Sequence, residues 1–127
     1  MSIYAAIRYS DPNAALDWLC KAFGFEQVVV HRDDDGVVGH AVLSHGTGKI
    51  MLSGGRDAGW LGGAAAEPLA SPISLYVAVG DPAAHHDRAA AEGATIVRAL
   101  EHMDYDSDEY SARDPEGNLW SFGTYRP

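Results

Sequence analysis

The stretch DPEGNLWSFGTY, residues 114–125, decides the fold more than any other part of the chain. Its first four residues are typical of a tight turn, and the large apolar Trp120 and Phe122 then alternate with smaller residues such as Ser121. Successive side chains of a strand point to opposite faces of a sheet, so Trp120 and Phe122 should share a core-facing side. The segment therefore predicts a turn followed by a strand, with Ser121 on the face away from the core.

The composition predicts one domain that does not bind nucleic acid or anionic membrane surfaces. The 127 residues, 46% of them hydrophobic, are enough for one substantial core but too few for two independent domains. A formal charge of -9 disfavours nucleic acid and anionic membrane surfaces as partners, and it favours a cationic ligand. No apolar run reaches the ~20 residues of a membrane span, and the start MSIYAAIRYSD does not resemble a targeting segment. We therefore expect a cytoplasmic protein that does not enter membranes.

Two stretches that begin at Ser10 and Gly80 imitate each other. Each starts with an Asp-Pro pair, continues with residues of helical composition and reaches a glycine before a β-rich run. The aspartate can accept hydrogen bonds from the first turn of a helix, proline suits the first helical position, and glycine suits the helix end. Both stretches are therefore predicted to be helices, and the lone Cys20 in the first is expected to be a small buried side chain.

Strand-like runs precede and follow each predicted helix, which gives the order βαβββ twice. We expect an α+β fold in which two βαβββ modules form a curved, cup-like mixed sheet with the helices on its outer face. The modules are residues 1–54 and 72–127 of a single domain, 1–127, and a Gly/Ala-rich connection over residues 55–71 joins them. A connection of this length is either a linker or a lid.

The alternation along the predicted strands separates a helix-covered face, which includes Ile3 and Ile73, from an opposite face of mixed character. The opposite face combines aromatic rings, small residues, hydroxyl groups and two cations, as at Tyr4, Arg8, Ser74 and Tyr76. This mixture is typical of a ligand cavity, although a half-solvated antiparallel face is the alternative. The small residues favour the cavity because they leave room for a ligand.

Several further residues are candidates for ligand contacts. His40 shares the parity of the cavity face, where it is either a structural hydrogen-bonding group or a ligand contact. Trp60, in the connection, either packs locally or covers a planar ligand. Tyr105 and Tyr110 lie within the charged run DYDSDEY, which is either a solvated loop or, through these two rings, the border of the cavity mouth. The DDDG sequence at residues 33–36 predicts a hairpin turn.

The duplicated βαβββ unit, its Asp-Pro helix starts and the ending RDPEGNLWSFGTY resemble the vicinal oxygen chelate superfamily. This superfamily includes glyoxalase, bleomycin-resistance proteins and extradiol dioxygenases, and the chain is most similar to the glyoxalase-like branch. The resemblance implies four metal-ligand positions, which fall on Tyr4, Met51, Ser74 and Ser121. None of these is a usual ligand of a divalent metal, so we expect no metal and no cofactor.

The resemblance and the residues together predict a metal-independent small-molecule binding protein, similar to the antibiotic-sequestering members. It should form a homodimer and bind a cationic or aromatic small molecule. The alternatives are a metal-dependent glyoxalase-like lyase, isomerase or dioxygenase that uses unrecognised ligands, and an accessory protein without a physiological ligand. No catalytic residue is identified, and the predicted ligand-binding residues are Tyr4, Arg8, His40, Met51, Trp60, Ser74, Tyr76, Tyr110 and Ser121.

Overall fold

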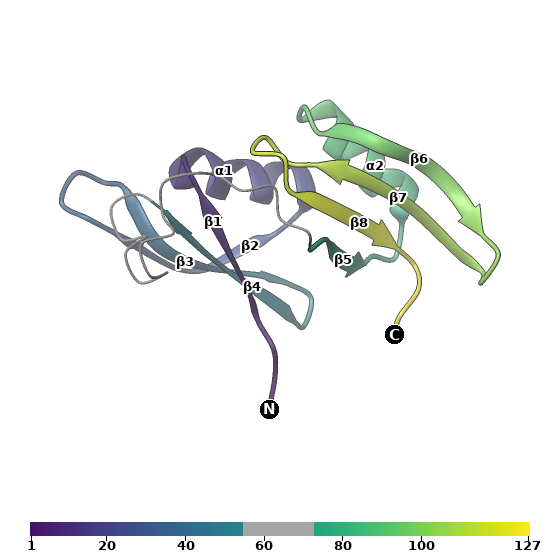
Figure 1. Ribbon diagram of the computed structural model, residues 1–127, viewed down its shortest axis with the longest axis horizontal. Helices are drawn as coiled ribbons and strands as arrows, with labels where there is room; N and C mark the ends of the chain where they lie inside the picture. Colours follow the sequence, from purple (N-terminus) through teal and green to yellow (C-terminus); the bar gives the residue numbers. More distant parts are fainter. Residues whose placement is uncertain (55–72) are drawn as a thin grey trace. The chain divides into compact units, whose positions relative to one another are not determined.

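Each half of the chain folds around its own four-stranded sheet (Figure 1). The computed structural model describes residues 1–54 and 73–127. Two units divide the chain, unit 1 (Met1–Leu69) and unit 2 (Ala70–Pro127), and the boundary between them falls inside the predicted connection. The α+β class and the predicted βαβββ order of both modules are confirmed.

Unit 1 contains one helix on a mixed sheet with the strand order β1-β4-β3-β2. β1 is parallel to β4, and the other neighbours are antiparallel. The elements are β1 (Ala5–Tyr9), α1 (Pro12–Phe23), β2 (Glu26–Arg32), β3 (Val38–His45) and β4 (Gly48–Gly54).

Unit 2 repeats this arrangement with the strand order β5-β8-β7-β6. β5 is parallel to β8, and the hairpins β6–β7 and β7–β8 are antiparallel. The elements are β5 (Leu75–Ala78), α2 (Pro82–Ala91), β6 (Thr95–Met103), β7 (Ser107–Arg113) and β8 (Leu119–Gly123).

Both helices begin at the predicted Asp-Pro pairs. The Asp11 carboxylate accepts a hydrogen bond from the Ala14 amide at 3.1 Å, and Asp81 accepts one from the Ala84 amide at the same distance. Each bond satisfies an amide that the first helical turn leaves without a partner. α1 ends at Gly24, whose φ of 79° lies in the left-handed region that glycine adopts readily.

The helices cover one face of each sheet and bury the apolar side chains there. In unit 1, α1 packs on β3 and β4, and Leu19 and Phe23 are fully buried together with Leu43 and Leu52. In contrast, Cys20, which was expected to be buried, is partly exposed. We call the opposite side of each sheet, which its own helix does not cover, the open face.

The core of unit 2 contains the two aromatic residues of the opening stretch. Trp120 and Phe122 are fully buried, their ring planes are nearly parallel, and their centroids lie 6.4 Å apart. Two other residues that the alternation placed on the core side, Ile3 and Ile73, are 99% and 71% exposed. They precede the strands, which begin only at Ala5 and Leu75, so the expected alternation does not extend to them.

The turn before β8 is organised by Asp114, which is almost completely buried. Its carboxylate accepts hydrogen bonds from the backbone amides of Glu116 and Asn118, both at 3.0 Å, and from the Trp120 indole Nε1 at 3.1 Å. Gly117 closes the turn with a φ of 88°. One side chain thus connects the turn to the largest residue of the core.

A similar turn confirms the predicted hairpin at DDDG. Asp33 accepts hydrogen bonds from the amides of Asp35 and Val37, both at 2.9 Å, and Gly36 has a φ of 80°. This aspartate is exposed and, in the part of the chain that the structure describes, makes no bond to a buried indole. The two turns are therefore alike in backbone hydrogen bonding and differ in their connection to a core.

Candidate functional site

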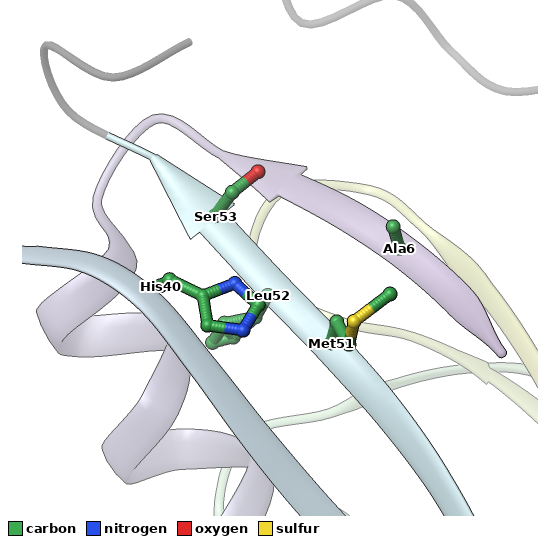
Figure 2. A pocket seen from close by; sticks show the side chains of 5 residues that line it. All are labelled: Ala6, His40, Met51, Leu52 and Ser53. Carbon is green, nitrogen blue, oxygen red and sulfur yellow. The ribbon is translucent and has the colours of Figure 1, made fainter. Parts of the chain in front are cut away.

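The open face of unit 1 contains a cavity of about 310 Å³, and its lining is mainly apolar. Figure 2 shows Ala6, His40, Met51 and Ser53 on the near side of the strands, whereas the Leu52 side chain lies behind β4 on the side of α1. Ala6 is the register partner of Met51, and His40 is the partner of Ser53. The alternation of the strands therefore delivers these four side chains to one surface.

Two polar side chains give this cavity its chemical character. Ser53 is 3% exposed. His40 is half-buried, and its ring stacks on that of His31 with centroids 6.1 Å apart. The His40 side chain lines this cavity, and its role as a ligand contact stays a prediction.

The open face of unit 2 carries a chain of polar contacts that includes Ser121. The hydroxyl oxygens of Ser121 and Ser111 lie 2.8 Å apart, and Arg98 Nε donates to the Ser111 hydroxyl at 3.1 Å. Arg98 Nη2 also forms an ion pair with Glu109 at 3.2 Å. Ser121 is therefore hydrogen-bonded to its cross-strand neighbour rather than left as an isolated hydroxyl.

Glu109 is the most buried charged group of this chain of contacts, with 4% exposure. Its burial opposes ionisation, but hydrogen bonds from Tyr105, Ser107 and Arg98, together with the Arg98 charge, outweigh burial and lower its pKa. The Tyr105 hydroxyl donates to the carboxylate at 2.8 Å. Glu109 is consequently an ionised, fully engaged carboxylate rather than an available base.

A glycine makes room for this carboxylate. A Cβ atom at Gly123 would lie 2.5 Å from Glu109 Cγ and 2.9 Å from the Tyr76 hydroxyl oxygen. Tyr76, a predicted site residue, is 38% exposed, and its hydroxyl donates to the Tyr125 carbonyl at 2.7 Å. Gly123 therefore allows Glu109 and Tyr76 to approach each other above β8.

The internal repeat places different chemistry at corresponding points of the two sheets. The pair Ala6 and Met51 of unit 1 corresponds to Tyr76 and Ser121 of unit 2. The pair His40 and Ser53 corresponds in the same way to Glu109 and Gly123. Unit 1 therefore presents an apolar cavity where unit 2 presents an internally paired polar surface.

The residues at the implied metal positions do not fit a divalent ion. Tyr4 and Ser74 precede β1 and β5, so the true cross-strand partners of Met51 and Ser121 are Ala6 and Tyr76. A thioether, a hydroxyl, a methyl and a phenol supply neither imidazole nor carboxylate ligands. Within residues 1–54 and 73–127, no group of three or more His, Cys, Asp or Glu side chains could hold a metal ion.

The remaining predicted site residues have different outcomes. Arg8 lies in β1 beside Ser53 in the register, and Tyr4 is 51% exposed ahead of the strand. Trp60 lies outside the described residues. The prediction that Tyr110 borders the cavity is wrong, because its side chain is fully buried on the helix-covered face, where it stacks on Phe122 at 5.1 Å.

Tyr110 is also the partner of a helix residue. Its hydroxyl is hydrogen-bonded to His85 Nδ1 of α2 at 2.5 Å, and burial raises the pKa of the phenol. The sequence interpretation missed Arg98, Glu109 and Ser111. The sequence did contain a signal for two of these residues. Alternation along EYSARD places Glu109 and Ser111 on one face of the strand and Tyr110 and Ala112 on the other face.

The chain belongs to the Glyoxalase/Bleomycin resistance protein/Dioxygenase superfamily, whose model matches residues 3–122. This confirms the resemblance stated from the sequence. The uncharacterized protein Rv0887c of Mycobacterium tuberculosis is 32% identical over 117 residues, covering 89% of this chain and 68% of that protein. The uncharacterized protein Mb0911c of Mycobacterium bovis is also 32% identical over 117 residues, covering 89% of this chain and 76% of that protein.

Solved structures give the same result for the fold. TioX from Micromonospora sp. ML1 aligns with a TM-score of 0.77 and 29% identity, covering 100% of this chain and 98% of TioX. A glyoxalase/bleomycin resistance protein/dioxygenase family enzyme from Burkholderia phytofirmans PsJN aligns with the same TM-score and 20% identity, covering 94% of both chains. No helix in the described ranges is long and apolar enough to cross a membrane.

Proposed function

We propose that the protein is a metal-independent small-molecule binding protein with its ligand site on the open face of unit 1. The observation that carries this proposal is the cavity of about 310 Å³, which lies at the low end of the range for ligand pockets. Its mainly apolar lining with two polar side chains is the usual composition of a site that binds small molecules.

The donor set supports binding over metal-assisted chemistry. The isomerases and dioxygenases of this superfamily use a bound ion as a Lewis acid, and the cross-strand pairs Ala6–Met51 and Tyr76–Ser121 offer no ligands for it. In unit 2, the Arg98 and Tyr105 bonds already engage the Glu109 carboxylate. Glu109 would therefore have to leave its ion pair with Arg98 before it could act as a general base.

The lining of the cavity also limits the chemical class of the proposed ligand. Met51 and Ala6 provide apolar contact, which suits an aromatic or aliphatic ligand body better than a charged one. The net charge of -9 still favours the approach of a cation by its long-range field. We further propose a cytoplasmic homodimer, as the antibiotic-sequestering members suggest, and sedimentation at micromolar concentration would check its size.

A ligand screen by thermal shift tests the binding proposal. A ligand at one hundred times its Kd should add about 2.7 kcal/mol to the free energy of unfolding. Ala6→Trp should fill the cavity and remove that stabilisation, whereas Ser44→Trp, on the same face of the sheet but outside the lining, should keep it. If both variants bind equally well, the ligand site is elsewhere.

Elemental analysis of the purified protein separates binding from the metal-dependent alternative. One tightly held divalent ion per chain, with an activity that chelation removes, would establish a lyase, isomerase or dioxygenase and refute our proposal. We expect no stoichiometric metal and an unchanged ligand affinity in the presence of a chelator.

A further inference from the structure

Two polar side chains in the unit 1 cavity have no hydrogen-bond partner among residues 1–54 and 73–127. Ser53 is 3% exposed, and its side chain lines the cavity (Figure 2). The His40 ring, across the strand pair from Ser53, has a stacking contact with His31 but no hydrogen bond to a described residue. No buried side-chain nitrogen or oxygen atom of the described residues lacks a partner, so both of these groups reach the open cavity, where a ligand can bond to them.

The positions of the two groups define a single recognition point. His40 and Ser53 are directly opposite in the antiparallel β3–β4 register, where Cβ atoms lie about 4.5–5.5 Å apart. A neutral imidazole offers one donor and one acceptor, and a hydroxyl offers both. Together they can serve an adjacent donor and acceptor on one edge of a ligand.

We infer that His40 and Ser53 determine specificity by binding a neutral, planar ligand with an adjacent N–H donor and carbonyl acceptor, as in a lactam or a primary amide. This inference rests on the proposed function. The apolar surroundings support a neutral ligand, because Ala6 and Met51 cannot replace the water that a charged group would lose. They also support a planar one, since a flat ring can lie against the methyl and thioether groups.

Isothermal titration with two matched probes tests the inference. The first probe is 2-quinolone, a neutral bicyclic lactam, and the second is 1-methyl-2-quinolone, which lacks only the N–H donor. We expect the lactam to bind about 2- to 10-fold more tightly, as one net hydrogen bond implies. Ser53→Ala and His40→Phe should each reduce lactam affinity by a similar factor. The variant that lacks the acceptor of the N–H should change binding of the methylated probe little, whereas the variant that lacks the donor to the carbonyl should weaken both probes.

Two control variants distinguish recognition from a general effect on the sheet. Ser44→Ala removes a hydroxyl from the same face of β3, and His31→Phe removes the imidazole that stacks on His40. Neither residue lines the cavity, so both variants should keep the preference for the lactam. A loss of preference in the controls equal to the larger of the losses in Ser53→Ala and His40→Phe would overturn the inference.

The remaining outcomes separate this inference from the binding function. Equal affinity for the two probes, or no affinity for either, overturns the assignment of His40 and Ser53 but leaves the ligand screen to decide on binding. Tighter binding of 2-naphthoate than of the lactam overturns the neutral class in favour of an anion. The proposed function itself fails when no ligand of the screen responds to Ala6→Trp, or when the protein holds a divalent ion whose removal abolishes an activity.

Discussion

Asp114→Ala should destabilise the protein far more than the position of this residue in a turn suggests. The change removes the acceptor of the Glu116 and Asn118 amides and of the Trp120 indole. The amides can turn to water, but the indole nitrogen belongs to a side chain with 0% exposure. An unpaired buried donor costs ~1–3 kcal/mol, and loss of the charge-assisted turn bonds adds ~1–2 kcal/mol, so we expect a total of about 3–4 kcal/mol.

The Asp33 turn offers a matched control for this prediction. Asp33→Ala removes the same type of amide bonds from an exposed turn and should cost only about 1 kcal/mol. Urea unfolding followed by far-ultraviolet circular dichroism gives both free energies, and an unchanged slope with denaturant shows that the unfolded states are comparable. The difference between the variants isolates the connection of the turn to the core.

A double-mutant cycle with Trp120→Phe makes the reasoning refutable. Phenylalanine fills most of the indole site but has no donor for the Asp114 carboxylate. If the Asp114–Trp120 bond carries the extra loss, the two substitutions should couple by about 1–2 kcal/mol. Additive effects, or equal losses for Asp114→Ala and Asp33→Ala, would refute the argument.

Two further predictions concern backbone space and pH. Gly54→Ala should lower the free energy of unfolding, measured in urea, by about 1–3 kcal/mol, because the new Cβ would lie 2.6 Å from the Tyr9 carbonyl oxygen. The control Gly48→Ala should cost under about 1 kcal/mol, because the nearest atom to its Cβ is 3.4 Å away. In an NMR titration His102 should show a pKa above its ordinary 6.5, because it is hydrogen-bonded to Asp108. A raised folded-state pKa stabilises the fold below the ordinary value, and the effect disappears as pH rises through the folded value. Asp108→Asn should remove the shift, and an unshifted titration in the unaltered protein would contradict the assignment.

The elements of the fold could be predicted because their signals are local. Asp11 and Asp81 begin helices through bonds to amides three residues away, and Trp120 alternates with Ser121 inside one short strand. The ends of the strands were harder to predict. Ile3 and Ile73 continue the apolar alternation in sequence, but they lie beyond the strand pairing that would bury them.

The candidate site residues could be predicted only in part, because their contacts depend on the pairing register of neighbouring strands. The cavity-facing position of His40 followed from alternation along a regular stretch of strand. The β6 strand, in contrast, changes register on both sides of Arg98, so its alternation cannot be read from sequence alone. The Arg98 bonds to Glu109 and Ser111 could therefore emerge only from the folded pairing.

The absence of a side chain at Gly123 has a consequence for protein engineering. Any substitution there would bring a Cβ atom to 2.5 Å from Glu109 Cγ, so the mutational tolerance of β8 is uneven. A library intended to create a ligand site on the open face of unit 2 should keep Gly123 and vary Leu119 and Ser121, which lie on the same face of the strand. A library that varies all three positions would mainly collect clones with impaired folding.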